Sequence, residues 1–442
     1  MLPPVGTARA SVIEEYLADA STGLVRQDTT FTPLPLRPRL GLNYVAPPQV
    51  GGGYNSAFGP QLVGGIAALF GDQLNNQQVI AVVQAQGQVQ DIGGQAQYIN
   101  TRRRWNWGGG ASHIPIPFLQ VGFTDEGGGL GAFNQYLVRV TFDQVSGLLQ
   151  YPLNMSQRFE MSAGVSRQVT TVQTFSTLID GAGNAVGQRR TGRQRIGDPL
   201  NTAQGTVAFV GDYSVFGLTS PLAGGRYRFE ASPLVGDLKW TQLTADYRRY
   251  LFFRPVTLAA RGLHIGRYGG NADQFTSLFA NNGAFGAQPL FLNVPGFNGF
   301  VRGYDFNNIN PNVECPPSFQ ATGSCPVIDR LVGSRVSAAS IEMRVPLLAP
   351  AGLGLIPTNF LPIDIVPFAD AGLAWAGNQQ ARLRFLTGEE LRTNTARVPV
   401  FSAGVSARIN LLGFAVIETY YARPFQRPDR NWVLGFQFAP GW

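Results

Sequence analysis

The sequence has little charge and almost no lysine or histidine. Charged residues make up 14% of the 442 residues, and Lys239 is the only lysine, whereas soluble domains carry roughly 25% charged residues. Low charge often reflects membrane helices, but no run of the sequence approaches the ~20 consecutive apolar residues that a spanning helix needs. The low charge therefore has to come from something other than membrane helices.

Residues that catalysis and metal binding require are also scarce. His113 and His264 are the only histidines, they lie far apart, and no Ser or Cys motif accompanies either. The sequence contains no nucleophile elbow, no HExxH and no phosphate-cradling loop. The glycine runs at 51–53, 108–110 and 127–129 are not followed by helical patterns, which excludes a dinucleotide fingerprint. We expect no catalytic residue, no cofactor and no metal site, and hence no enzyme.

Two cysteines, Cys315 and Cys325, enclose nine residues in "CPPSFQATGSC". A metal site would need two further soft ligands close by, and none is present. The pattern favours a disulfide in an oxidising compartment over a pair of free thiols.

Arginine accounts for the net charge of +7 and the pI near 9.6. Two explanations stay open: attraction to anionic lipid head groups or to a polyanionic client, and a genome that favours arginine. Arg102, Arg103 and Arg104 adjoin Trp105 and Trp107 at an expected turn, which is typical of an anchor at a membrane interface. No nucleic-acid-binding fold accompanies them, so we expect no nucleic-acid partner.

Alternation with a period of two dominates the chain, and Gly, Pro, Asn and Asp turns bound the alternating segments. In "NWVLGFQF" (431–438), for example, Trp432, Leu434 and Phe436 share one face, while Val433 and Gln437 share the other. Large aromatics fill the apolar face of strand after strand, and many charges lie on the opposite face. An apolar outside and a polar inside are typical of a transmembrane β-barrel.

The pattern predicts an all-β fold, a 16-stranded antiparallel transmembrane β-barrel, at residues 39–442. The expected strands are 39–45, 61–71, 77–88, 94–101, 104–113, 133–150, 157–172, 202–213, 225–236, 239–251, 255–267, 333–347, 363–375, 398–409, 413–422 and 431–439. The even number agrees with bacterial single-chain barrels. Short turns alternate with longer connections, including 114–132, 173–201 and 268–332, which predicts an outer-membrane protein with both termini in the periplasm.

Residues 1–38 are polar and proline-rich, and we interpret them as a linker or N-terminal extension. The start "MLPPVGTARA" has neither the basic residues nor the apolar core of a signal peptide. Because a barrel needs export, we expect an upstream part that carries the signal.

One arginine in the long connection between expected strands 11 and 12 has two candidate partners. Arg302 lies in "GFNGFVRGYDF" (296–306), and strand alternation puts Glu342 and Asp370 on the inner faces of the two following strands. An unmatched buried charge costs roughly 3–5 kcal/mol. If the connection folds inward, Arg302 can meet both carboxylates, and Gly303 allows a close backbone approach.

Three motifs carry a family resemblance: "VRGY" (301–304), "SIEMRVPL" (340–347) and "PFADAG" (367–372). In this order and spacing they resemble the BamA-like outer-membrane assembly and translocation superfamily, the bacterial surface antigen barrels. The resemblance covers about residues 37–442 and implies sixteen strands, with Arg302 contacting Asp370 and Glu342. We call this expected set the lumen latch; its residues are Val301, Arg302, Gly303, Tyr304, Glu342, Phe368, Asp370 and Gly372.

The N-terminal half, with "RPRLGLNYV" and "RRRWNWGGG", is similar to a subgroup in which a TolB-like propeller precedes the barrel. Neither a propeller nor the polypeptide-transport repeats of the best-known members are present in this sequence. Two functions therefore stay open: insertion or translocation of client outer-membrane or secreted proteins, and anchoring of an upstream periplasmic domain. We disfavour a passive porin because an inward connection would fill the pore. Outer-membrane lipid and lipopolysaccharide are further expected partners.

Overall fold

The computed structural model describes residues 39–55, 58–273, 300–305, 309–317, 325–358, 360–387, 390–411, 413, 415–428 and 430–438. Contacts divide the chain into two units, Met1–Arg39 and Leu40–Trp442, and all the described strands belong to the second unit. The interpretation of residues 1–38 as a linker lies outside the described residues and stays a prediction.

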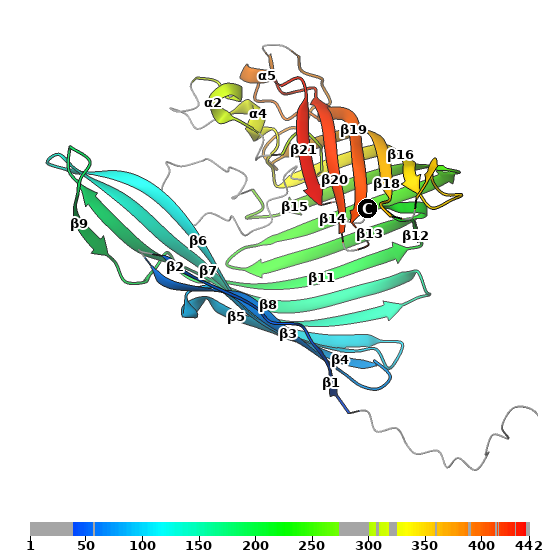
Figure 1. The fold of residues 1–442 in the computed structure, drawn as a ribbon, viewed down its shortest axis with the longest axis horizontal. Helices are drawn as coiled ribbons and strands as arrows, with labels where there is room; N and C mark the ends of the chain where they lie inside the picture. Colours follow the sequence, from blue (N-terminus) through cyan, green and yellow to red (C-terminus); the bar gives the residue numbers. More distant parts are fainter. Residues whose placement is uncertain are drawn as a thin grey trace, which may run out of the picture. The chain divides into compact units, whose positions relative to one another are not determined.

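The described part of the second unit is almost entirely β-structure, which confirms the all-β prediction (Figure 1). The strands are β1 (Gly41–Val45), β2 (Gln49–Asn55), β3 (Gly59–Gly71), β4 (Gln77–Gly87), β5 (Ile92–Asn100), β6 (Asn106–Gly127), β7 (Leu130–Pro152), β8 (Gln157–Ile179), β9 (Ala185–Arg190), β10 (Gln194–Arg195), β11 (Leu200–Asp212), β12 (Val215–Phe216), β13 (Pro221–Gly236), β14 (Trp240–Phe253), β15 (Val256–Tyr268), β16 (Arg335–Ala349), β17 (Ile356–Pro357), β18 (Ile363–Trp375), β19 (Val400–Leu411), β20 (Ala415–Pro424) and β21 (Val433–Phe438). Short helices are η1 (Val89–Asp91), α2 (Pro311–Glu314), α4 (Pro326–Asp329) and α5 (Glu390–Thr393). No helix in the described ranges is long and apolar enough to cross a membrane.

All the strands belong to one sheet, and neighbouring strands follow one another along the chain (Figure 1). β1 and β2 pair with opposite ends of β3, and antiparallel pairing then continues through the longer strands as far as β20 with β21. The two-residue β17 pairs parallel with β16. The sheet is divided into 21 strand segments, and within the described residues no pairing joins β21 to β1, β2 or β3. Closure into a barrel and the count of sixteen both stay predictions.

Two expected connections are wrong, because the chain continues as strand there. Residues 114–127 belong to β6 and pair with β7 as far as Gly127 and Leu130, and residues 173–179 extend β8. Pro115 and Pro117 made this stretch look like a loop. They are tolerated because β6 pairs with β5 only up to His113, so that beyond it β6 pairs with β7 alone, and proline is accepted on edge strands.

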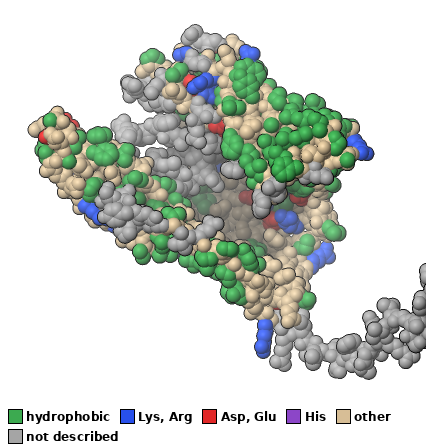
Figure 2. All heavy atoms as spheres, in the orientation of Figure 1, with side chains coloured by type: hydrophobic (Ala, Val, Ile, Leu, Met, Phe, Trp, Pro, Cys, Tyr) green, Lys and Arg blue, Asp and Glu red, His purple; other side chains and the backbone are tan. Residues whose placement is uncertain are grey.

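Strand alternation separates a polar inner face from an apolar outer face. On β16, Ser340, Glu342 and Arg344 are buried, whereas Ile341 and Met343 are 65% and 42% exposed. Figure 2 shows the same separation: hydrophobic side chains cover the surface over the C-terminal strands, and charged side chains lie inside the hollowed centre of the view. The inner face of β16, β18, β19 and β20 carries the candidate site.

Candidate functional site

The connection between β15 and β16 folds against this inner face. We call its residues 300–305 the inward segment. Val301 and Tyr304 are buried, at 0% and 1% exposure, although the sequence around them resembles a loop. They belong to one apolar cluster with Ile309, Cys315, Cys325, Val327, Ile328, Leu331, Val336, Ala374 and Val400. The inward segment therefore has a hydrophobic core of its own, which fixes the arginine between these two side chains.

The guanidinium of Arg302 is surrounded by three carboxylates. Its Nε donates to Asp370 Oδ2 and its Nη2 to Asp370 Oδ1, both at 2.8 Å, so that this pair is bidentate. Its Nη1 lies 2.9 Å from Glu418 Oε1 and 3.0 Å from Glu342 Oε1. The guanidinium carbon lies 3.5 Å from the centroid of the Phe368 ring, as in a cation–π contact. Each polar edge of the arginine thus has an acceptor, and one flat face has an aromatic ring.

Two arginines of the sheet complete the charge balance. Arg408 of β19 donates to Glu342 Oε1 at 2.7 Å and to Glu418 Oε2 at 3.1 Å, and Arg344 of β16 donates to Glu342 Oε2 at 2.9 Å. With Arg302 and Asp370, this makes three arginines and three carboxylates, and each of these side chains is at most 4% exposed. The network is neutral as a whole, and removing any one member leaves a buried net charge.

Burial alone would lower the pKa of Arg302, because a guanidinium is harder to charge away from water. The hydrogen bonds of Asp370 and the charges of Asp370, Glu342 and Glu418 outweigh this effect and raise the pKa of Arg302 above its ordinary value. The arginine therefore stays charged at any pH at which the fold persists.

Gly303 is required by the backbone and by the space around it. Its φ is +89°, in the left-handed region that favours glycine. A Cβ at this position would lie 3.3 Å from the Cβ of Ala422 on β20. The Gly303 carbonyl accepts a hydrogen bond of 2.7 Å from Arg427 Nη1, and Arg427 also forms a fully buried pair with Glu314 Oε1 at 2.6 Å. A second charged contact thus joins the connection to the residues after β20.

Tyr304 extends the inward segment toward the start of β19. Its hydroxyl lies 3.1 Å from the Phe401 carbonyl and accepts a hydrogen bond of 2.9 Å from the backbone N–H of Gln426. Burial raises the pKa of Tyr304, so the hydroxyl stays protonated. In the same connection, Cys315 and Cys325 are joined as a disulfide between α2 and α4.

The structure brings most of the expected latch residues together. Arg302 contacts Asp370, Glu342 and Phe368, and Val301, Gly303 and Tyr304 hold the backbone around it. Gly372 lies two residues beyond Asp370 on the same face of β18 and pairs with Ala338; its place in the expected set rests on the motif alone.

Glu418, Arg408 and the pair of Arg427 with Glu314 were not expected from the sequence. On β20 the buried Glu418 and Tyr420 alternate with less buried residues, so alternation could have placed Glu418 on the inner face. No sequence signal shows that β20 lies within reach of Arg302. Among the described residues, no group of His, Cys, Asp and Glu could hold a metal ion. The contacts of the site therefore hold the inward segment against the inner face of the sheet.

Comparison with known proteins gives one family. Residues 217–441 match the Omp85 superfamily domain, which is more than half of the 442 residues. No curated protein matches the chain.

The solved structures that are similar include two outer-membrane proteins. One is BamA from Haemophilus ducreyi lacking POTRA domains 1–3, with 14% identity and a TM-score of 0.48 over 91% of this chain and 75% of that one. The other is CdiB from Acinetobacter baumannii, with 11% identity and a TM-score of 0.40 over 91% of this chain and 65% of that one. Because the family model covers more than half of the chain, including the strands β16, β18, β19 and β20 that carry the charged network, the chain belongs to the Omp85 superfamily and is a bacterial outer-membrane protein.

Proposed function

We propose that this protein aids the insertion or translocation of client proteins at the bacterial outer membrane, by letting a client strand pair at the seam between its first and last strands. Family membership supports this role at the level of the superfamily. The observation that carries the proposal is the short length and incomplete pairing of the two terminal strands. β1 has five residues and β21 has six, and within the described residues each pairs on one edge only.

An unpaired strand edge presents N–H and C=O groups that can template another strand. The strand next to β21 is by contrast firmly held, because Glu418 of β20 forms ion pairs with Arg302 and Arg408. In this proposal the charged network keeps the last strands in place while the seam exchanges partners. The role needs no catalytic residue, and the expected orientation, with both ends of the barrel at the periplasmic side, would let a periplasmic partner domain deliver clients.

The test is gene deletion followed by quantification of the other outer-membrane proteins by mass spectrometry, with rescue by seam variants. Leu42→Cys or Val45→Cys of β1 would be combined with Leu434→Cys or Phe436→Cys of β21, with each single variant as control. We expect deletion to lower the level of a set of outer-membrane proteins. The parent and the single variants should restore that level, and a cross-linked pair should do so only after reduction.

Unchanged outer-membrane proteins after deletion would contradict the proposal. That result would favour the anchor function, in which the barrel only tethers an upstream periplasmic domain. Full rescue by a cross-linked pair would contradict seam opening while leaving the assembly role standing.

A further inference from the structure

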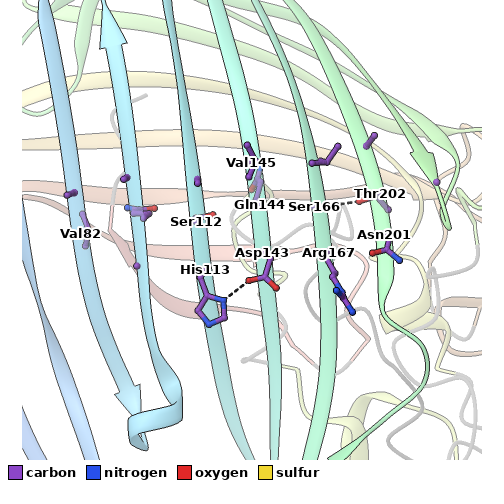
Figure 3. A pocket seen from close by; sticks show the side chains of 18 of the residues that line it. Val82, Ser112, His113, Asp143, Gln144, Val145, Ser166, Arg167, Asn201 and Thr202 are labelled. Carbon is purple, nitrogen blue, oxygen red and sulfur yellow. Dashed lines mark hydrogen bonds and ion pairs between the residues drawn. The ribbon is translucent and has the colours of Figure 1, made fainter.

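A row of polar side chains crosses the outer face of the sheet, on the side that the strand pattern assigns to lipid. His113 of β6, Asp143 of β7, Arg167 of β8 and Asn201 of β11 are register partners on four neighbouring strands. Figure 3 shows them side by side. Register partners carry this face from Val145 through Val165 and Ala203 to Val235 of β13. Val235 shares its face with Tyr227 and Phe229 and lies opposite Arg228 and Glu230, so this face is the apolar outer one.

Only part of the charge in this row is balanced within the protein. His113 Nδ1 lies 2.5 Å from Asp143 Oδ1. Arg167 is exposed, and its side chain makes no hydrogen bond or ion pair with any residue that the structure describes. A free guanidinium on an outer wall is available to an anionic ligand.

An apolar hollow of about 980 Å³ adjoins the row. Its wall is formed by small side chains on the same face, among them Ala96, Ala111, Val145, Val165 and Ala203. A hollow of this size can receive hydrocarbon chains, and its residues lie on the side of the row that leads to the turns after β5 and β7.

The position of the row follows from the aromatic residues near those turns. Phe159 and Phe209 lie 5.0 Å apart on the outer face, and Trp105 and Tyr151 lie 4.6 Å apart at the neighbouring turns. Such aromatic girdles mark a membrane boundary. Arg167 is eight residues from Phe159 along β8, which is about 27 Å along the strand and about 20 Å along the membrane normal at a tilt of about 40°. The apolar band of such barrels is about 25 Å tall, so the polar row lies near the opposite boundary.

We propose that this row and hollow form a binding site for one phosphorylated glycolipid of the outer leaflet, of the lipid A type. Arg167 binds a lipid phosphate, with His113 and Asn201 beside it, and an acyl chain lies in the apolar hollow. The proposal rests on the expected orientation, with the turns after β5 and β7 in the periplasm. It does not depend on client handling.

The test is a titration of the detergent-folded chain with bisphosphorylated lipid A, with its dephosphorylated form, and with inorganic phosphate, followed by native mass spectrometry. The variants are Arg167→Gln and Asp143→Asn. Arg189→Gln is the control, because Arg189 is also exposed but pairs at Ser176, nine residues further along β8. We expect Arg167→Gln to weaken binding of bisphosphorylated lipid A about tenfold. Asp143→Asn should strengthen it about twofold to fivefold, because a like charge is removed.

Opposite effects of the two variants would separate a charge-recognition site from a structural role, in which both variants would weaken binding. Equal affinity of the parent for the phosphorylated and the dephosphorylated lipid would overturn the proposal. This comparison uses the parent alone, so it can be made even if a variant fails to fold. The proposal would also be overturned if the Arg167→Gln variant bound bisphosphorylated lipid A as tightly as the Arg189→Gln variant does. Saturation of the site by inorganic phosphate alone, at the same concentration as the lipid, would overturn it too.

Discussion

Arg302→Ala is the perturbation whose cost can be reasoned most closely from the structure. Without this side chain, Glu342 keeps Arg344 and Arg408, and Glu418 keeps Arg408. Asp370 loses its only arginine among the described residues and keeps the Ser340 hydroxyl, which donates to it at 2.6 Å. One buried carboxylate is then without a cation, which costs about 3–5 kcal/mol in the free energy of unfolding.

Asp370→Asn should lower the free energy of unfolding by less than Arg302→Ala does, because Arg302 still has two carboxylates within 3.0 Å. We expect about 2–3 kcal/mol, the range of a hydrogen bond to a charged group. The double variant should be less destabilised than the sum of the single variants, because the two side chains contact each other. Arg302→Lys should fall between the parent and Arg302→Ala, since it keeps the charge but loses the bidentate fork.

The assay is equilibrium urea unfolding of the chain folded in lipid vesicles, followed by tryptophan fluorescence and by heat-modifiable gel mobility. Hydrogen exchange of residues 300–305 reports whether the inward segment is released before the sheet unfolds. Arg261→Ala is the matched control: Arg261 pairs with Asp246 at 2.8 Å on the inner face, but Asp246 also keeps Arg248. We expect about 1 kcal/mol for it. If Arg302→Ala unfolded and exchanged like Arg261→Ala, the reasoning would be wrong.

Three further variants probe the surroundings of the arginine. Glu418→Gln should destabilise the fold by about 2–3 kcal/mol, because two arginines lose a charged acceptor; unfolding identical to that of the parent would show that the network does not include β20. Gly303→Ala should cost more than Gly183→Ala, by about 1 kcal/mol, since both have positive φ but an added Cβ contacts Ala422 only at Gly303; equal losses of stability in the same urea assay would argue against the close approach. Cys315→Ser should raise hydrogen exchange around α2 and α4 and cost on the order of 2–3 kcal/mol locally; unchanged exchange in this connection would contradict a structural disulfide.

Much of this arrangement follows from strand alternation. Because successive side chains point to opposite faces, the face of Glu342 and of Asp370 could be assigned before the structure was known. The expected partners of Arg302 depended on one further assumption, that the connection folds inward. The apolar residues Val301 and Tyr304 on either side of the arginine are the physical reason that it does, because they are buried in a core of their own.

Alternation does not tell which strands come within reach of one side chain. Glu418 lies on β20, separated from β16 by β18 and β19, and only the curvature of the sheet brings its carboxylate to the same guanidinium. Strands were expected at 104–113 and 157–172, but the extensions of β6 and β8 beyond them were not. On β6 the reason is that Pro115 and Pro117, which usually end a strand, lie there on an edge. The expected number of strands depends on closure, which local patterns do not determine.

The most direct test of the inward arrangement is cross-linking of the inward segment to the sheet. Gly303→Cys combined with Ala422→Cys introduces two thiols on Cβ positions that lie 3.3 Å apart, just below the Cβ–Cβ spacing of about 3.5–4.5 Å in natural disulfides. Gly183→Cys combined with Ala422→Cys is the control pair. We predict that mild oxidation in native membranes links the first pair and not the second. Folded protein with no cross-link between positions 303 and 422 would contradict the inward arrangement.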